Sequence, residues 1–215
     1  HELKTPITSI KGFAELLAGG LVKDERKSRE YLLRIRDESE RMTSIIEDIL
    51  KISSLEAEEY HPPLTQVDLL EVAKEAVDQV SHEAQKNGIT VTAQGESVTI
   101  LAFREDVFQM ISNLVDNAVK YTPAGGAVTL RAVGYELFCR VDVTDTGPGI
   151  PESEQARIFQ RFYRSPSASE AEGVGIGLYL ARQIAAGQGG YLKVSSRPGE
   201  GSTFSLFLPR AEERT

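Results

Sequence analysis

The sequence predicts an α+β protein in two parts, a helical hairpin over residues 1–58 and an α/β sandwich over residues 67–211, joined by a linker over 59–66. The first part lacks strand-like alternation and spaces its apolar residues as helices do. After residue 63, helix-like and strand-like segments follow each other without regular alternation, which is typical of one sheet covered on one face by helices. The charged, Pro-containing stretch EAEEYHPPL between the two parts indicates a linker.

The hairpin consists of two amphipathic helices separated by a break at Gly19 and Gly20, residues that commonly end helices. The apolar positions of the first helix step by three and four along Leu3, Ile7, Ile10, Ala14 and Leu17. The second helix carries a similar seam, widened by Leu32, Ile46 and Leu50, at Ile35, Met42, Ile45, Ile49 and Ile52. Two helices cannot bury seams this wide, so we expect a homodimer that forms a four-helix bundle. The alternative is that the hairpin packs onto the rest of its own chain.

The sandwich contains three expected helices, over residues 67–87, 104–122 and 176–188. Asn87-Gly88 and Pro123 mark the ends of the first two. Alternating apolar residues predict strands over 88–95, 97–102, 190–198 and 201–209, and a strand hairpin that turns near Gly134 over 126–145.

The composition excludes several classes of protein. A net charge of −8 and an isoelectric point near 5.1 argue against a sequence-independent nucleic-acid binder, which needs a basic stripe. The single cysteine, Cys139, rules out an intrachain disulfide and is expected to be a buried apolar residue. No apolar run approaches the length of about 18 residues that spans a membrane, so we expect no membrane contact by this chain.

The segment NLVDNAVKYT places chemically useful side chains on one face of a helix. Asn113 and Asn117 are four residues apart and Lys120 follows three residues later on the same stripe. Two amide oxygens and an ammonium suit a Mg²⁺ ion and the phosphates it bridges. The same pattern also occurs on ordinary solvated helix faces.

Three further segments combine glycines with charged or aromatic residues. In DTGPGIP, Asp145 ends a strand and Gly147 and Gly149 allow a ligand to approach the main chain. In GVGIGLYLAR, Gly175 and Gly177 lead into a helix whose unpaired N–H groups favour an anion. RIFQRFYRSP combines two phenylalanines with two arginines, Arg161 and Arg164.

The order and spacing of these segments resemble the cytoplasmic core of two-component sensor histidine kinases. HELKTP is similar to the H box of that family, NLVDNAVKYTP to its N box, DTGPGIP and GVGIGL to its glycine boxes, FQRFYR to its F box and GEGSTFSLFLP to its closing strand. The resemblance covers the whole chain. It implies a dimerisation and histidine-phosphotransfer hairpin followed by an ATP-binding sandwich of the histidine kinase and gyrase type.

By this resemblance the chain would bind ATP and Mg²⁺. Asp145 would accept a hydrogen bond from the adenine amino group, Thr203 would assist it, and Tyr121 would pack on the base. Asn113 and Asn117 would hold Mg²⁺, and Lys120 would contact the phosphates. Gly175 and Gly177 would bound a lid, and Arg161 or Arg164 would neutralise the γ-phosphate.

The resemblance assigns the N-terminal residues to phosphoryl chemistry. His1 would be the phosphoacceptor, Glu2 would accept its proton or orient its ring, and Thr5 would orient a water that dephosphorylates the partner. On the helical seam His1 and Thr5 face away from Leu3 and so project to solvent. Pro6 is expected to bend the helix, because it removes the hydrogen bond to the carbonyl of Glu2.

One difference from related ATPases bears on the chemistry. Gyrase and mismatch-repair ATPases carry a glutamate four residues before the Mg²⁺-binding asparagine, and here that position is Asn113. An amide cannot act as a general base, so we expect slow hydrolysis and a nucleophile from elsewhere, which His1 can supply.

The expected function is autophosphorylation on His1 and transfer to an aspartate of a response regulator receiver domain, with a second activity as a phosphatase. The alternative is a catalytically silent nucleotide-binding module that signals through partner binding. We expect this part of the protein to be cytoplasmic and the parent protein to be anchored in a bacterial membrane. His61 and His82 have no metal-ligand partner at suitable spacing and are expected to be structural or surface residues.

Overall fold

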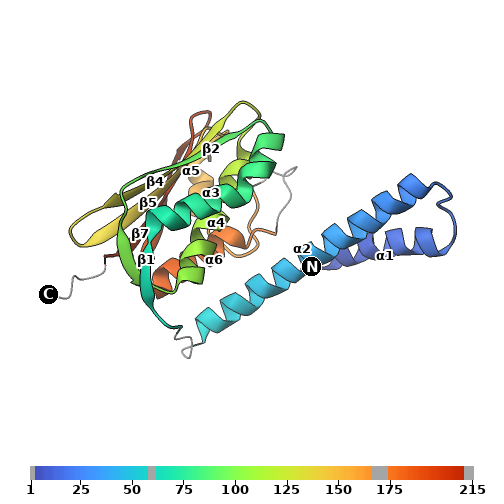
Figure 1. The fold of residues 1–215 in the computed structure, drawn as a ribbon, viewed down its shortest axis with the longest axis horizontal. Coiled ribbons are helices and arrows are strands. Elements are labelled where there is room, and N and C mark those ends of the chain that lie inside the picture. Colours follow the sequence, from blue (N-terminus) through green and yellow to red (C-terminus); the bar gives the residue numbers. More distant parts are fainter. Residues whose placement is uncertain (1–2, 58–61, 166–173, 211–215) are drawn as a thin grey trace. The chain divides into compact units, whose positions relative to one another are not determined.

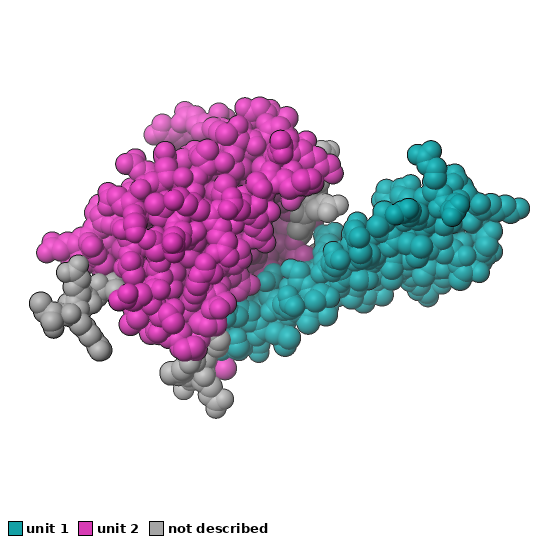
Figure 2. All heavy atoms as spheres, in the orientation of Figure 1, with its two compact units in different colours: residues 1–56 teal, residues 57–215 magenta. Residues whose placement is uncertain are grey.

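A computed structural model describes residues 3–57, 62–165 and 174–210. The chain divides into two compact units, residues 1–56 and residues 57–215, drawn in teal and magenta in Figure 2. No helix in the described ranges is both long and apolar enough to cross a membrane.

The first unit is a helical hairpin of α1 (Lys4–Ala18) and α2 (Glu25–Glu56). The expected break is confirmed: the N–H of Gly20 bonds to the carbonyl of Leu17 at 3.2 Å, and Gly20 has a φ of +64°. Inside the hairpin the rings of Phe13 and Tyr31 lie 5.0 Å apart. Pro6 lies in the first described turn of α1 and is buried. The bend expected beside Glu2 involves residues outside the described ranges.

Much of the apolar surface of the hairpin remains uncovered in a single chain. Six large apolar side chains of its two helices are between 37% and 63% exposed: Ile7, Leu16, Leu32, Leu33, Ile46 and Leu50. Scattered single exposed leucines are normal, but six on one short hairpin form an apolar surface that its own two helices do not cover.

The second unit is built on a five-stranded sheet whose strand order is β2-β4-β5-β7-β6. β2 and β4 are parallel and the other neighbours are antiparallel. The strands are β2 (Thr90–Gly95), β4 (Ala127–Gly134), β5 (Phe138–Asp145), β7 (Gly201–Pro209) and β6 (Tyr191–Arg197). A separate antiparallel pair joins β1 (Thr65–Asp68) to β3 (Thr99–Ala102).

Three helices pack on one face of this sheet (Figure 1), as the sequence predicts: α3 (Leu69–Lys86), α4 (Arg104–Tyr121) and α6 (Gly177–Gly187). A short helix, α5 (Glu152–Gln155), lies near β6. The centre of α4 is fully buried, with Val107, Met110, Ile111 and Leu114 at 0% exposure, because its apolar residues recur at helical spacing. This burial fixes the rotation of α4 and therefore the direction of its polar face.

Two expected elements differ in detail. The predicted helix over 67–87 begins at Leu69, because Val67 and Asp68 end β1. The predicted strands over 88–95 and 97–102 are not neighbours: β2 pairs with β4 and β3 pairs with β1. Gly95, with a φ of +124°, turns the chain from one sheet to the other, and a Cβ there would lie 2.1 Å from the carbonyl oxygen of Ala132.

Asp68 caps the N-terminus of α3. Its Oδ1 accepts hydrogen bonds from the N–H groups of Leu70 at 2.7 Å and Glu71 at 3.2 Å, and its Oδ2 accepts one from the hydroxyl of Ser97. Burial alone would raise the pKa of this carboxyl, but the three hydrogen bonds outweigh it and lower the pKa. The cap thus joins β1, α3 and the loop before β3.

We predict that Asp68→Ala lowers the free energy of unfolding of the second unit by about 1 kcal/mol at neutral pH, as loss of an N-cap does. Because the folded-state pKa is lowered, the stabilisation is present above the ordinary aspartate pKa of 3.8 and is lost as the pH falls through the folded-state value. The difference between wild type and variant should therefore shrink in acid. Urea unfolding followed by circular dichroism measures it. Asp78→Ala, at an exposed position in the interior of the same helix, is the matched control and should not lower stability, because alanine is the better helix former.

Candidate functional site

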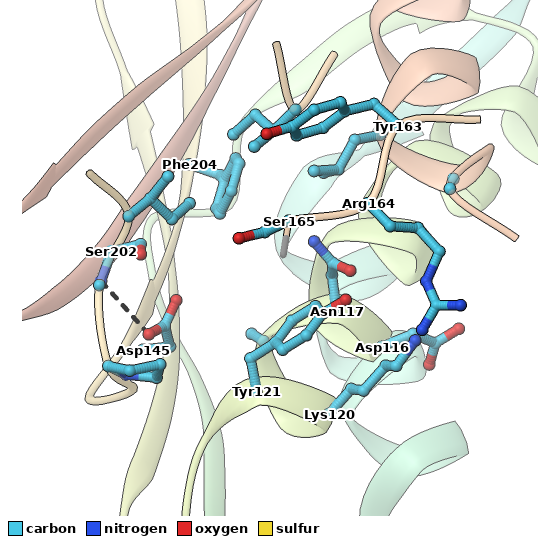
Figure 3. A pocket seen from close by; sticks show the side chains of 18 of the residues that line it. Asp116, Asn117, Lys120, Tyr121, Asp145, Tyr163, Arg164, Ser165, Ser202 and Phe204 are labelled. Carbon is cyan, nitrogen blue, oxygen red and sulfur yellow. Dashed lines mark hydrogen bonds between the residues drawn. The ribbon is translucent and has the colours of Figure 1, made fainter. Parts of the chain in front are cut away.

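A cavity of about 570 Å³ opens in the second unit beside α4, the end of β5 and the start of β7 (Figure 3). Its volume suits a small-molecule ligand. Its lining includes Asn113, Asp116, Asn117, Ala118, Lys120, Tyr121, Asp145, Pro148, Gly149, Ile150, Pro151, Ile158, Tyr163, Arg164, Ser165, Gly175, Gly177, Leu178, Pro198, Ser202 and Phe204.

One wall of the cavity is the polar face of α4. Asn113, Asn117 and Lys120 all line it, which confirms that their spacing brings them together. The amide nitrogen of Asn113 donates a hydrogen bond to the carbonyl of Gly177 at 3.2 Å. That bond ties α4 to the start of α6 and orients the side chain so that its oxygen remains available to a ligand.

The opposite wall carries Asp145, which is only 6% exposed. Its Oδ1 accepts hydrogen bonds from the N–H of Gly147 at 2.8 Å and of Ser202 at 3.2 Å (Figure 3). Burial raises the pKa of Asp145, and the two N–H donors oppose that rise. Because both donors bond to Oδ1, Oδ2 is the atom through which this carboxylate can bind a ligand donor.

Tyr121 extends from the last turn of α4 toward the space between the two walls (Figure 3). The Nζ of Lys120 lies 5.3 Å from the centre of its ring. Burial raises the pKa of the Tyr121 hydroxyl, and the charge of Arg164 lowers it in part. The side chain therefore offers a neutral aromatic surface near Asp145.

The predicted glycines hold the loops of the site close to their neighbours. Gly149 has a φ of +72°, and a Cβ there would lie 1.9 Å from the carbonyl oxygen of Arg197. Gly175 has a φ of +74°, and its Cβ would lie 2.5 Å from the carbonyl oxygen of Tyr163. Gly147 lies under the cavity wall, where a Cβ would be 2.8 Å from Oδ1 of Asp145, and Gly177 lines the cavity at the start of α6.

Three of the predicted nucleotide-binding residues, Gly147, Arg161 and Thr203, are not among those that line the cavity. Thr203 lines a second hollow, of about 260 Å³, that Asp145 and Ser202 also line, and its hydroxyl lies 3.0 Å from that of Thr144, so its role beside Asp145 stays a prediction. Ser202 is the residue of β7 that pairs with Asp145, and its N–H bonds to the carboxylate. Arg161 is exposed, with its guanidinium 5.1 Å from the ring of Phe162, whereas Arg164 lines the cavity.

The structure adds residues that the sequence pattern did not identify. Ser202 and Phe204 enter the site from β7, and Asp116 enters from α4. Asp116 is exposed at the rim, yet the surrounding protein and the negative charge of Glu83 raise its pKa to about 6. The alternation of side chains along β7 would have identified Ser202 only if the register of β7 on β5 were known. That register depends on residues far apart in the sequence.

The N-terminal site residues are described in part. His1 and Glu2 lie outside the described ranges, while Thr5 is exposed on α1. His82 is exposed on α3, and His61 lies outside the described ranges. Within the described part of the chain no three His, Cys, Asp or Glu side chains gather as a metal site would require.

Comparison with known families assigns both units. Residues 1–58 match the His Kinase A (phospho-acceptor) domain, and residues 102–212 match the histidine kinase-, DNA gyrase B- and HSP90-like ATPase family. The chain belongs to the sensor histidine kinase family. Both parts that this family needs to phosphorylate a histidine at the expense of ATP, the acceptor domain and the ATPase-type domain, are present in order.

Among its relatives are two characterised sensors. Sensor protein kinase PmrB of Pseudomonas aeruginosa is 31% identical over 99% of this histidine kinase chain, which covers 44% of PmrB. SenX3 of Mycobacterium tuberculosis is 32% identical over 97% of the chain, which covers 52% of SenX3. The chain thus spans about half the length of these relatives.

Solved structures agree in fold. AdeS of Acinetobacter baumannii superposes with a TM-score of 0.81 at 21% identity and covers 98% of both chains. ThkA in complex with the response regulator protein TrrA gives a TM-score of 0.78 at 26% identity, over 100% of this chain and 60% of ThkA. Full-length ShkA, in complex with AMPPNP, gives 0.77 at 30% identity over 98% of this chain and 44% of ShkA.

The cavity of this histidine kinase fits a nucleotide. It pairs a buried carboxylate, which recognises an N–H donor, with amide oxygens and cationic groups on the other side. Amide oxygens are hard ligands acceptable to Mg²⁺ but carry no charge. The donor set on α4 therefore suits an ion that arrives already paired with phosphates.

We predict that Gly149→Ala destabilises the second unit and weakens binding of a fluorescent ATP analogue to the kinase, because the new methyl group collides with the main chain of Arg197. Gly125→Ala is the matched control: Gly125 also has a positive φ, +84°, but a Cβ there meets no atom within 4 Å. The control variant should lose only about 1 kcal/mol of unfolding free energy, because its alanine introduces backbone strain but no collision. Thermal unfolding and fluorescence titration measure both effects, and equal losses in the two variants would contradict the close-approach argument.

Proposed function

We propose that this chain binds Mg²⁺ and ATP in the cavity, transfers the γ-phosphoryl group to His1, and passes it on to an aspartate of a response regulator. The observation that carries the proposal is the arrangement of two opposed walls. The buried carboxylate of Asp145 faces the asparagines and the lysine of α4 across one cavity of about 570 Å³. A base with an amino group and a chain of phosphates need these two kinds of partner at the two ends of one site.

At the base end, Oδ2 of Asp145 would accept the hydrogen bond of the adenine amino group. Oδ1 is held by two main-chain N–H groups, so the carboxylate is oriented before the ligand arrives. The N–H of Ser202 thus supports the carboxylate, and Thr203, which lines a neighbouring hollow together with Asp145, would assist it. The ring of Tyr121 would pack on the base, since aromatic side chains stack readily on nucleobases.

At the phosphate end, the side-chain oxygens of Asn113 and Asn117 would hold Mg²⁺, directly or through water. The ion would neutralise the phosphate charge and orient the γ-phosphoryl group for transfer. Lys120 and Arg164 line the same cavity and would contact the phosphates. The start of α6, which Asn113 fixes, would present its N–H groups to the same anion.

The site lacks a side chain suited to hydrolysis at the position that related ATPases use. Asn113 cannot remove a proton from water. The carboxylate of Asp116 lines the same cavity three residues after Asn113 and is influenced by the charge of Glu83, but it does not stand at the position that the glutamate of related ATPases occupies. Slow hydrolysis would preserve bound ATP until the imidazole of His1 reaches it.

His1 would receive the phosphoryl group on a ring nitrogen, and Glu2 would accept the proton or orient the ring. Thr5 would support a second activity, the dephosphorylation of the response regulator, by positioning the water that removes the phosphoryl group. Its exposure on α1 leaves it accessible to such a partner. The response regulator as partner is supported by the relative ThkA, whose structure is a complex with the response regulator protein TrrA.

We predict that incubation of the chain with Mg²⁺ and γ-labelled ATP gives an acid-labile label that His1→Gln abolishes. His82→Gln, an exposed histidine on α3, is the matched control and should keep the label. Asp145→Asn should also abolish the label, but for another reason, since it should lose binding of a fluorescent ATP analogue while His1→Gln retains it. Asp142→Asn, on the same strand with its side chain on the other face, should keep that binding.

Three outcomes separate the alternatives. A label that persists in His1→Gln would contradict His1 as the acceptor. Nucleotide binding without any label would support the alternative of a silent signalling module. Release of inorganic phosphate without labelled protein would indicate a plain ATPase and contradict the argument from Asn113.

We also propose that the hairpin forms a four-helix bundle with a second copy of the chain. The support is the set of exposed apolar side chains on α1 and α2, which a partner hairpin would bury. The longer protein to which the chain would belong is proposed to be anchored in a bacterial membrane, with this part in the cytoplasm.

We predict that the chain sediments as a dimer and that Leu32→Glu, at a position 59% exposed on α2, weakens association at least about tenfold, because a buried leucine contributes about 1.5–3 kcal/mol. Leu21→Glu is the control, since Leu21 is 74% exposed in the loop between the helices. Sedimentation across a range of concentrations measures the association constant. A wild-type monomer at all concentrations would contradict the bundle.

A further inference from the structure

The face of the sheet opposite α3, α4 and α6 carries an uncovered aromatic and cationic surface. Along β5, β6 and β7 alternate residues point to the helices and are mostly buried, so the intervening ones point outward. We call the outward set the outer face. It includes Phe138, Arg140 and Asp142 of β5, Phe207 of β7, and Tyr191 and Lys193 of β6.

Four aromatic rings form a continuous row across the outer face. Tyr135, in the turn after β4, stacks on Phe138 with ring centres 4.5 Å apart and planes 22° apart. Phe138 contacts Phe207 at 5.7 Å, and Phe207 stacks on Tyr191 at 4.6 Å and 17°. Within the row, Tyr191 is 49% exposed and Phe138 is 36% exposed, and Leu137 beside it is 80% exposed.

Cations surround the row although the chain as a whole is acidic. Lys193 lies 5.2 Å from the ring centre of Tyr191, and Arg140 lies 5.5 Å from that of Tyr135. Arg210 bonds to the carbonyl of Tyr135 at 3.0 Å, and Arg131 occupies an exposed position of β4. Arg140 forms an ion pair with Asp142 at 3.0 Å. Within the described ranges no ion pair is formed by Lys193, Arg131 or Arg210. Among the described residues, three cations without an ion pair therefore gather beside this row, on a chain of net charge −8.

The orientation of the rings selects the kind of ligand. A surface that stacks nucleobases must present open ring faces. Here neighbouring rings cover one another's faces, and Lys193 lies over two of them. What remains for a ligand is ring edges, which carry partial positive charge and attract carboxylates.

We propose that the outer face is a docking surface for an acidic segment of a partner protein that carries apolar side chains between its carboxylates. The carboxylates would pair with Lys193, Arg131 and Arg210, and the apolar side chains would rest beside Leu137 and Phe138. Phe138 and Asp145 stand at opposite ends of β5, about 23 Å apart at the usual rise of a strand. Docking at the aromatic end therefore leaves the nucleotide cavity open.

The test uses the whole chain, which contains no Trp, so the emission of a probe tryptophan reports binding without interference. The probe is a synthetic peptide of about twelve residues made of Glu and Asp with one Trp and one Leu. We expect saturable binding with a Kd below about 1 mM that weakens as salt is raised. Lys193→Glu should weaken binding about fivefold or more, as charge reversal at a docking face does. The matched control Lys86→Glu, at an exposed position in the last turn of α3, should not.

Two further probes define the outcomes that would overturn the proposal. A peptide with Lys in place of every acidic residue should not bind, and a twelve-nucleotide oligothymidylate should bind more weakly than the acidic peptide. Equal or tighter binding of either would contradict an acidic protein segment as the occupant. So would an equal effect of Lys193→Glu and Lys86→Glu. Unchanged binding of a fluorescent ATP analogue in Lys193→Glu would show that the variant remains folded.

Discussion

The nucleotide site depends on how one buried carboxylate is held. Asp145 ends a central strand and is 6% exposed, so its charge would be costly without partners. Two main-chain N–H groups stabilise it, one from the turn that follows and one from the neighbouring strand β7. Gly147 is required there because any side chain would collide with Oδ1. The tight turn, the pairing of Ser202 with Asp145 and the free oxygen that a ligand can reach thus meet at one carboxylate.

The same sheet has two faces with different physical character. On the inner face, helices bury the core and orient α4 so that its asparagines and lysine face Asp145. On the outer face, no helix of the described ranges packs, and the exposed positions carry stacked rings and cations. A nucleotide at one end of β5 and a protein segment at the other could therefore bind at the same time.

Local patterns predicted most of the fold and much of the site. Asn113, Asn117 and Lys120 were found because helical spacing alone places them together, and the core of α4 followed from the same period. Alternation along β7 predicts that Ser202 and Thr203 face opposite ways, but only the pairing with β5 shows that Ser202 is the one opposite Asp145. The partner of β2 was missed for the same reason, since it follows α4 more than thirty residues later in the chain. The aromatic row likewise forms only when four separate segments come side by side.

The most direct test is a crystal structure of the chain with Mg²⁺ and a non-hydrolysable ATP analogue. We expect the adenine amino group within hydrogen-bond distance of Oδ2 of Asp145, with Tyr121 beside the base. We expect the ion and the phosphates against Asn113, Asn117 and Lys120. An analogue bound in the reverse orientation, or outside this cavity, would contradict the central claim that the two walls recognise the two ends of ATP.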